Sequence, residues 1–341
     1  MNDILEVQKK VIPEMIELLE KRYNILRSIY FSQPIGRRTL ANSLELGERV
    51  IRTETTMLRE SRLIDIDSSG MKLTDEGIDI LNSLQDFMHD VKGLSDLEKT
   101  IADQLNIKKV IIVPGIYDED SCVVKDIGKI ASLFVKKQLF EGCIAGITGG
   151  TTMYEVVEAL QSTDINKSFL IVPARGGVGA NLEIQANNIA ATFARKLGGE
   201  YKLLQAPDNV NKEAFESLVR LPEIQELVEI IKKLDILMFG IGRADKMAKR
   251  RNLSNEQFEE LEKGNAVAEA FGYYFDIDAN IIRESNTIGL QLDDFKKIKL
   301  AIGVACGKEK AEAMMAISRL KKDLVLIMDE GAARALLDKL F

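Results

Sequence analysis

The sequence predicts an α/β protein in two parts: an N-terminal winged helix-turn-helix domain, followed by a mostly parallel, doubly wound α/β domain. Within the first ninety residues, two short helical patterns separated by a three-residue turn lead into a hairpin pattern. From Lys108 onward, short apolar runs alternate with helical patterns. The 341 residues are enough for two domains, and we place the boundary near Gly93, giving domains 1–93 and 94–341.

Composition excludes several kinds of chemistry. The single histidine, His89, excludes Ser-His-Asp and Cys-His catalysis and multi-histidine metal sites. The three cysteines (Cys122, Cys143 and Cys306) lie far apart, so neither a disulfide framework nor a zinc site is expected. Without a signal pattern or an apolar run of transmembrane length, the protein is expected to be cytoplasmic, with no membrane partner. The net charge of −7 still leaves room for a local basic face.

The first ninety residues are predicted to form helices followed by a β-hairpin. Apolar positions at helical spacing predict a helix within residues 1–30. A short helix is predicted over Gly36–Leu44, then the turn Glu45–Gly47, then a second helix from about Glu48 to Arg62. Two alternating runs around Ser68-Ser69-Gly70 read as a β-hairpin, which completes a winged helix.

The second helix of this motif has a core face and a polar face. Ile51, Thr55 and Leu58 lie at i, i+4 and i+7 and are expected to point to the core. The other face carries arginine forks and threonine hydroxyls, the groups that dock on phosphates and read the major groove. The DNA-binding residues are therefore expected to be Arg37, Arg38, Arg49, Arg52, Thr53 and Thr56. The alternative is a solvated helix with ordinary surface charge.

A further helix is predicted after the hairpin, with Thr74 as its cap. On this helix, Leu81, Leu84, Met88 and Val91 step by three, four and three residues. This seam fits either a short coiled coil or packing against the winged helix itself.

Six apolar runs in the second part fit buried parallel strands. They are Val110–Val113, Ile144–Ile147, Phe169–Val172, Leu234–Phe239, Leu300–Val304 and Leu324–Met328. Helical patterns fall between them at about 121–140, 152–161, 183–197, 222–232, 309–320 and 330–339. Ligands in such sheets bind beyond the carboxyl ends of the strands, so the loops that follow strands are the candidate site.

The run Thr148-Gly149-Gly150-Thr151-Thr152 sits between a predicted strand and a predicted helix. A glycine pair lets the backbone bend sharply with its amides uncovered, and the helix N-terminus adds free N–H groups. Such a corner suits an anion of phosphate size. It is not an ATP P-loop, because that loop needs a lysine that is missing here. The alternative is an ordinary strand-to-helix turn.

Later strand ends also carry polar residues. Pro173-Ala174-Arg175-Gly176-Gly177 continues through Val178-Gly179-Ala180-Asn181 and places one arginine in a glycine-rich loop before Gln185. Gly240-Ile241-Gly242 begins like GxGxxG, but its sixth position is Asp245, so NAD binding is only weakly indicated.

Basic residues follow the later strands. The cluster after the GIG run reads mostly as a solvated face from which one arginine can turn inward, and it comprises Arg243, Lys246, Lys249, Arg250 and Arg251. Lys308 and Lys310 follow the strand that ends at Val304. Together with the threonines and Arg175, these cations indicate a site for an anion, one that can have two charged ends.

A winged helix followed by TGGTT, PARGG, GIGRAD and GVACGKEKAEAM in that order resembles the SorC-type sugar-binding transcriptional regulators, over essentially the whole chain. Within that family, the resemblance is to the branch that regulates central glycolytic genes in Gram-positive bacteria. It implies a repressor that binds operator DNA as a homo-oligomer, dimer or tetramer, and is relieved by a phosphorylated sugar, fructose 1,6-bisphosphate, with no cofactor. The family's effector domain is similar to sugar-phosphate isomerases and deaminases.

Carried onto this chain, the resemblance implies nine effector-binding residues: Gly149, Gly150, Thr151, Thr152, Arg175, Gln185, Arg250, Glu269 and Lys310. The related deaminases rely on a carboxylate base with a partnering histidine, and the one histidine here is far from TGGTT in sequence. We therefore expect no enzyme and no catalytic residue. An isomerase or deaminase with an appended DNA-binding-like domain stays open, because Glu269 or Asp245 can act as a base. So does a repressor whose glycine loop binds no metabolite.

Overall fold

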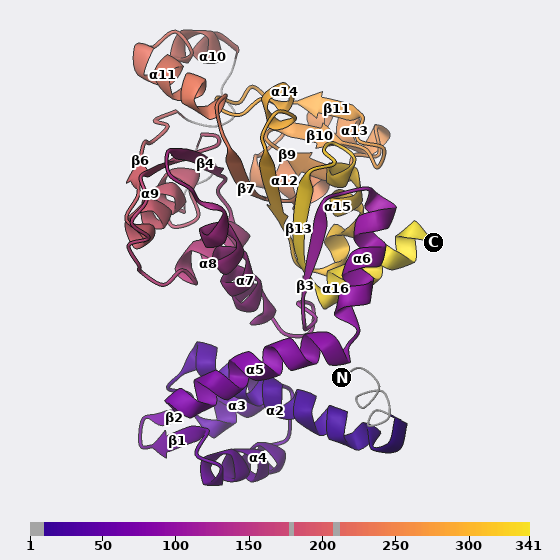
Figure 1. Ribbon diagram of the computed structural model, residues 1–341. Coiled ribbons are helices and arrows are strands. Elements are labelled where there is room, and N and C mark those ends of the chain that lie inside the picture. The colour runs from indigo at the N-terminus through magenta and orange to yellow at the C-terminus, as the bar shows by residue number, and fades with distance from the viewer. Residues whose placement is uncertain (1–9, 177–180, 207–211) are drawn as a thin grey trace. The chain divides into compact units, whose positions relative to one another are not determined.

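The computed structural model describes residues 10–176, 181–206 and 212–341. It contains two compact units (Figure 1). The first comprises the chain up to Ser95 together with Glu119–Cys122, and the second comprises Asp96–Asp118 and Val123–Phe341.

The first unit is a winged helix-turn-helix, as predicted. Its elements are α2 (Pro13–Ser32), α3 (Arg37–Ser43), α4 (Glu48–Glu60), β1 (Ile64–Asp67), β2 (Gly70–Leu73) and α5 (Asp75–Val91). Strands β1 and β2 pair antiparallel. On α4, Ile51 and Leu58 enter the hydrophobic core of the unit, and Thr55 is buried beside them with its hydroxyl donating to the carbonyl of Ile51 at 2.7 Å. The helical spacing of the core face is therefore confirmed.

Helix α5 is capped and packed within its own unit. The Thr74 hydroxyl oxygen accepts a hydrogen bond from the Gly77 amide at 3.0 Å, which confirms the predicted cap. Leu81 and Met88 belong to the core of the first unit, and Leu84 packs against it. The structure therefore uses the seam to hold α5 against the winged helix.

A seven-stranded parallel sheet lies at the centre of the second unit, and the six predicted strands are all in it. In spatial order the strands are β3 (Lys109–Val113), β13 (Leu324–Asp329), β12 (Leu300–Val304), β7 (Ile236–Gly240), β4 (Cys143–Ile147), β5 (Phe169–Pro173) and β6 (Glu200–Tyr201). The open edge of β3 is covered in part by Glu98, whose carboxylate accepts from the amide of Ile112 at 2.7 Å.

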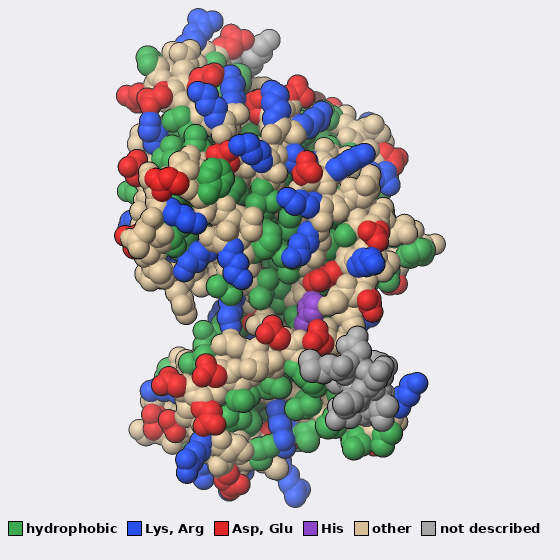
Figure 2. Space-filling model, viewed as in Figure 1, with side chains coloured by type: hydrophobic (Ala, Val, Ile, Leu, Met, Phe, Trp, Pro, Cys, Tyr) green, Lys and Arg blue, Asp and Glu red, His purple; other side chains and the backbone are tan. Residues whose placement is uncertain are grey.

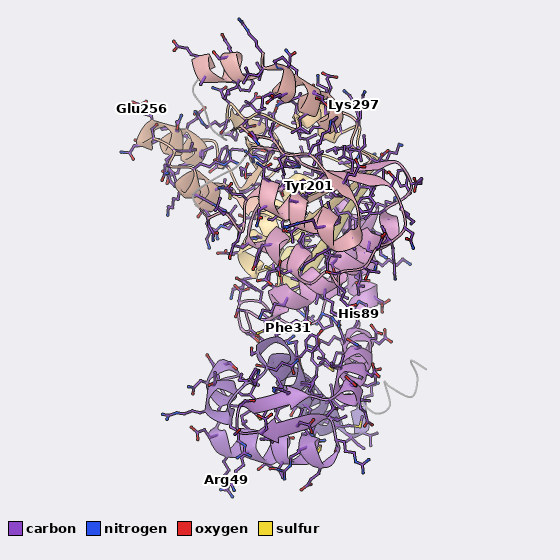
Figure 3. All side chains as sticks on the ribbon, turned by 90° about the vertical axis from the view of Figure 1, so that its left-hand side faces the viewer. Phe31, Arg49, His89, Tyr201, Glu256 and Lys297 are labelled. Atoms are coloured by element: carbon purple, nitrogen blue, oxygen red, sulfur yellow. The ribbon has the colours of Figure 1, made fainter. Side chains whose placement is uncertain are left out.

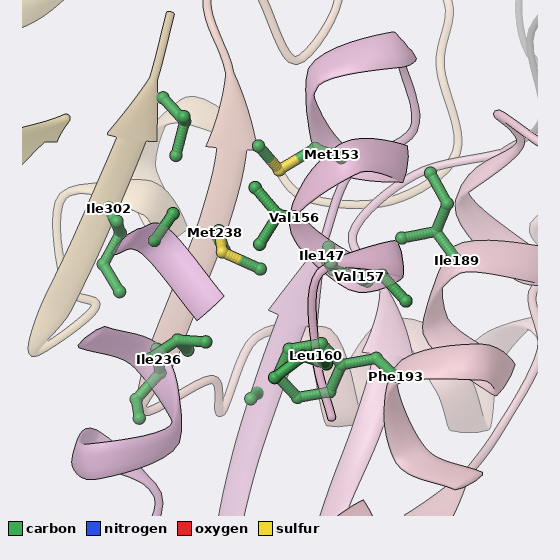
Figure 4. Close-up of a cluster of buried hydrophobic side chains, with 14 of the residues drawn as sticks. Ile147, Met153, Val156, Val157, Leu160, Ile189, Phe193, Ile236, Met238 and Ile302 are labelled. Atoms are coloured by element: carbon green, nitrogen blue, oxygen red, sulfur yellow. The ribbon is translucent and has the colours of Figure 1, made fainter. Parts of the chain in front are cut away.

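Helices cover both faces of this sheet, as a doubly wound fold requires (Figure 1). One face carries α7 (Val123–Gln138), α8 (Thr151–Glu158) and α9 (Ala186–Leu197), and the other carries α15 (Ala311–Ser318) and α16 (Glu330–Leu340). Helix α6 (Leu94–Leu105) leads into β3. A hydrophobic core lies under the first group of helices, where Ile147 and Met238 of the sheet meet Val156 and Phe193 (Figure 4).

Several short elements of the second unit were not predicted. They are α10 (Lys212–Leu218), β8 (Gly242–Arg243), α12 (Ala244–Arg250), α13 (Asn255–Lys263), β9 (Ala268–Ala270), β10 (Tyr273–Phe275), β11 (Ile281–Glu284), α14 (Leu292–Phe295) and the edge strand β6. The helix predicted at about 309–320 begins with a 3₁₀ turn, η1 (Lys308–Lys310), before α15. Strands β8 to β11 form a second, antiparallel sheet in the order β11-β10-β9-β8. Strands of two to four residues are too short for an alternating pattern to stand out in sequence.

Charges of both signs are interspersed on the face of the protein shown in Figure 2. Among the described helices, none is both long and apolar enough to cross a bilayer.

The close approach of α5 to the turn after α4 gives a test of this packing. A Cβ at Gly77 would lie 2.0 Å from the carbonyl oxygen of Leu63, a backbone atom that has no room to move. We expect Gly77→Ala to lower the free energy of unfolding of the winged helix by about 3 kcal/mol. Urea denaturation of the full chain, followed by circular dichroism, measures this loss. As control, Gly47→Ala meets no atom within 4 Å and is expected to cost less than about 1 kcal/mol; equal losses would contradict the packing.

Candidate functional site

The order in which the chain adds strands to the parallel sheet reverses between the neighbouring strands β4 and β7. From β4 the chain proceeds outward through β5 to β6, whereas from β7 it proceeds the opposite way through β12 to β13. The loops after β4 and β7 therefore leave in opposite directions, and a crevice opens at the carboxyl ends of these strands. A cavity of about 250 Å³ lies there, lined by residues that follow β4, β5, β7 and β12.

All nine residues expected to contact the effector line this one cavity: Gly149, Gly150, Thr151, Thr152, Arg175, Gln185, Arg250, Glu269 and Lys310. Of the expected PARGG loop, Arg175 and Gly176 lie at the cavity, whereas Gly177, Val178, Gly179 and Ala180 are outside the described residues. Residues separated by 161 positions in the chain are thus brought to one place by the strand order.

The two glycines of the β4 loop are required for different structural reasons. Gly150 has φ of +121°, a conformation that side chains disfavour, and the space beside its Cα is open. A Cβ at Gly149 would lie 2.7 Å from the carbonyl oxygen of Ile184, so this glycine allows the segment before α9 to approach and brings Gln185 to the cavity. The amide of Gly150 donates to Ile184 at 2.8 Å. The expectation that both glycine amides are uncovered is therefore wrong for Gly150.

The available donors of this corner are at the start of α8. Helix α8 begins at Thr151 without a side-chain cap, and the first amides of a helix have no partner inside it. The Thr151 side chain is exposed, whereas Thr152 is buried with its hydroxyl hydrogen-bonded to the Cys306 thiol. Burial raises the pKa of that thiol to about 11, so Cys306 stays protonated and is not a nucleophile.

A buried carboxylate joins two arginines in the lining of the site. Glu269 Oε1 accepts from Arg175 Nη1 at 3.0 Å, from Arg251 Nη2 at 2.9 Å and from the amide of Gly272 at 2.8 Å. All three side chains are more than nine-tenths buried. Two buried arginines thus share one buried carboxylate, and all three side chains line the cavity.

The charge state of Glu269 follows from its partners. Burial by itself would raise the pKa of its carboxyl, but Arg251 and Arg175 outweigh that effect and hold the pKa below its usual range. The Gly272 amide reaches the carboxylate because Phe271 and Gly272 both have positive φ and form a two-residue hairpin turn between β9 and β10. The tight turn thus aims a backbone donor at the buried charge.

Arg251 was not among the expected effector contacts, although the sequence holds a signal for it. Ala244 and Ala248 are buried on α12, and Arg251 continues their line at i, i+4 and i+7. Arg251 is therefore the arginine of the basic cluster that turns inward. Other lining residues also went unpredicted: Ile241, Arg243, Lys246, Met247 and Phe271.

The two carboxylates that left an enzyme possible are poor bases in this arrangement. Glu269 already accepts three hydrogen bonds through one oxygen and has a lowered pKa. Asp245 is also buried in part, but its bidentate pair with Arg243, at 2.9 and 2.8 Å, lowers its pKa. His89 belongs to α5 in the first unit. General base catalysis needs a group with a pKa near the working pH, which neither carboxylate provides.

In the first unit, α4 presents the expected face. Arg49, Arg52 and Thr53 are exposed and Thr56 is half-buried, and Figure 3 shows Arg49 projecting away from the unit. Arg37 and Arg38 are exposed in the first turn of α3.

The two threonines of this face hold their hydroxyl protons within α4. Thr53 donates to the Arg49 carbonyl at 3.1 Å and Thr56 to the Arg52 carbonyl at 2.8 Å. Their oxygens therefore remain as acceptors, which suits the amino groups of bases better than phosphate oxygens.

Local charge also distinguishes α4 from the wing. Glu54, the buried acid of α4, pairs with Lys21 at 2.6 Å and with Arg22 at 3.0 Å, so it does not oppose the arginines electrostatically. At the tip of the wing, Asp67 accepts from the amides of Ser69 and Gly70. The hydrogen bonds from Ser69 lower the pKa of Asp67, which keeps the tip anionic. The cationic surface of this unit is thus on its helices.

Family models match both units. Residues 18–88 match the CggR N-terminal DNA binding domain, and residues 89–338 match the family described as "Putative sugar-binding domain". Fold and site together define a DNA-binding transcriptional repressor with a sugar-binding domain. The chain belongs to the SorC family of sugar-binding transcriptional regulators.

Relatives support this placement. The chain is 42% identical over 337 residues to the central glycolytic genes regulator of Bacillus subtilis, covering 99% of both chains. It is 41% identical over 337 residues to the regulator of the same name from Priestia megaterium, covering 98% of each. These relatives are regulators and not enzymes, which confirms the expectation that the chain is not an enzyme.

Solved structures agree. A SorC family transcriptional regulator from Enterococcus faecalis matches with a TM-score of 0.67 and 36% identity, covering 71% of this chain and 99% of the other. The full-length sorbitol operon regulator SorC from Klebsiella pneumoniae matches in fold with a TM-score of 0.68 and 18% identity, covering 94% of this chain and 98% of the other.

The shared carboxylate predicts a strong effect on stability. In Glu269→Gln the two buried arginines lose their counter-charge, and we expect the free energy of unfolding to fall by about 3 kcal/mol at pH 7. Because the folded pKa of Glu269 is lowered, its contribution is fully present above the unfolded value of about 4.5 and is lost as the pH falls through the folded pKa. The difference between wild type and variant should therefore shrink at acid pH.

Urea denaturation at a series of pH values measures this difference. The control is Glu256→Gln at an exposed position of α13, expected to change stability by less than about 0.5 kcal/mol. A difference that stays constant, or grows, as the pH is lowered would contradict the assignment of the charge to Glu269.

Proposed function

We propose that this repressor controls glycolytic genes, binds operator DNA through the arginine face of α3 and α4, and is released by fructose 1,6-bisphosphate bound in the cavity at β4 and β7. The observation that carries the proposal is the buried pair of arginines on Glu269, which lines the same cavity as the N-terminus of α8.

Among the described residues that line the cavity, six side chains are cationic and one, that of Glu269, is anionic. Within the described part of the chain, no carboxylate pairs with Arg250 or Lys310, which also line the cavity. An anionic ligand supplies the missing negative charge. Each charge-assisted hydrogen bond contributes about 1.5–3 kcal/mol, so a few are enough for the roughly 8 kcal/mol of micromolar binding.

The cavity supports a ligand with two anionic ends. One end is the start of α8, where Thr152 is hydrogen-bonded to Cys306. The positive charge of Lys310 also acts on the Cys306 thiol and lowers its pKa against the larger effect of burial. The other end is the pair Arg175 and Arg251 on Glu269. Two phosphoryl groups joined by a sugar suit this arrangement. The relatives are named for central glycolytic genes, so we propose a sugar bisphosphate of glycolysis, fructose 1,6-bisphosphate, as the ligand.

Regulation requires the ligand to bind the free and the DNA-bound protein differently. We propose a dimer or tetramer in which each winged helix places the α4 face in a major groove. Ligand binding in the second unit changes the packing between subunits and lowers DNA affinity or cooperativity. A coupling of about 1–3 kcal/mol per site gives five- to 150-fold changes in affinity.

For ligand binding, we expect Lys310→Met to weaken fructose 1,6-bisphosphate binding about tenfold, because one charge-assisted contact is lost. The matched control is Lys308→Met, which removes the same charge from an exposed lysine that does not line the cavity. Calorimetric titration measures both. Ligand at 100 times its dissociation constant should also stabilise the wild type by about 2.7 kcal/mol. Absence of a thermal shift with every phosphorylated sugar would favour a repressor that senses no metabolite.

For DNA binding, we expect Arg52→Ala to weaken operator binding about tenfold, because a long cationic contact to the groove is removed. The thermal shift with ligand should persist, since Arg52 lies in the first unit. Arg195→Ala, at an exposed position of α9, removes the same charge and is the control. Fluorescence anisotropy with labelled operator measures the affinities, and unchanged binding by Arg52→Ala would remove this side chain from the DNA interface.

A further inference from the structure

An ion-pair network lies along one rim of the cavity. Lys246 Nζ donates to both oxygens of Glu309, at 2.7 and 2.8 Å, and Arg243 Nη1 donates to Glu309 Oε2 at 3.0 Å. Arg243 also holds Asp245 through its other nitrogens. Arg243 and Lys246 line the cavity, whereas Glu309 does not. Arg243 and Lys246, two of the cations that line the cavity, are therefore paired with carboxylates that do not line it.

The position of Glu309 makes it a bridge between two walls of the site. Arg243 and Lys246 follow β7, whereas Glu309 lies in η1 after β12, next to Lys310. The network of four charged side chains has no net charge. Among the described residues, Lys246 forms an ion pair with Glu309 alone, so Glu309 decides whether this charge is available to a ligand.

We propose that Glu309 is a specificity-determining residue of the ligand site: an internal counter-anion that neutralises the Arg243 and Lys246 rim and limits the advantage of highly charged ligands. The inference rests on the proposed function, because it concerns the same site. Glu309 touches no ligand in this account. It acts through the two cations that do line the cavity.

The physical basis is competition for the same donors. The side chains of Lys246 and Glu309 are 59% and 37% exposed, and such an ion pair is weak enough for a bound phosphoryl group to exchange with it. Removing the carboxylate charge raises the net charge of the rim by one, so the electrostatic potential at the ligand space becomes more positive. The resulting gain in binding free energy scales with the charge of the ligand, so a sugar bisphosphate gains about twice as much as a monophosphate.

The test is calorimetric titration of the full-length Glu309→Gln protein with fructose 1,6-bisphosphate and with fructose 6-phosphate. We expect the dissociation constant of the bisphosphate to fall about sixfold and that of the monophosphate about 2.5-fold, from the charge scaling. The matched control is Glu312→Gln. It makes the same change three residues away and breaks the exposed pair with Lys339, which does not line the cavity. This control should change neither constant by more than about 1.5-fold.

A second variant separates charge from structure. In Glu309→Gln combined with Lys246→Gln, the released cation is gone, and bisphosphate affinity should return to within about twofold of the wild type. If Glu309 only holds the turn that carries Lys310, Glu309→Gln weakens both ligands and the second substitution does not restore binding, which overturns the inference. An unchanged ratio of the two constants also overturns it. Failure of the wild type to bind either sugar phosphate would instead refute the proposed function, and this inference with it.

Discussion

The site depends on one buried carboxylate that is shared by two arginines. Glu269 lies on a three-residue strand, Arg175 follows β5 and Arg251 ends α12, so a single oxygen atom joins three parts of the chain. Burying charges is costly unless they are paired, so the arrangement depends on every member of the cluster. Further cations, among them Arg250 and Lys310, line the same cavity, and on these we base the proposal of an anionic ligand.

The topology of the sheet explains why so many distant residues meet. The reversal between β4 and β7 leaves a crevice that any doubly wound sheet would have. This chain fills the crevice with short loops whose ends are fixed by close backbone contacts. Gly149 against Ile184 brings the start of α9 to the start of α8, and the Phe271-Gly272 turn brings a backbone amide to Glu269. Helix termini and amides thus complement the cationic side chains.

Sequence patterns predicted the winged helix, the six long strands and the residues around TGGTT because each has a local signal: helical spacing, an apolar run or a glycine pair. They did not predict the small sheet of β8 to β11, whose strands have two to four residues. Nor did they identify the Arg251 pair, because Glu269 is 18 residues away along the chain and nothing local links the two. For the same reason the sequence did not show that the Gly150 amide is occupied, since the carbonyl that accepts from it, that of Ile184, is distant in sequence.

In this account, sensing is the binding of an anionic ligand by the N-terminus of α8 and the arginine pair on Glu269. The most direct measurement is a crystal structure of the full chain grown with fructose 1,6-bisphosphate. The account predicts density for one phosphoryl group within hydrogen-bond distance of the Thr151 and Thr152 amides and for the other beside Arg175 and Arg251. A saturated crystal with the ligand elsewhere, or with the cavity closed by neighbouring side chains, would contradict it.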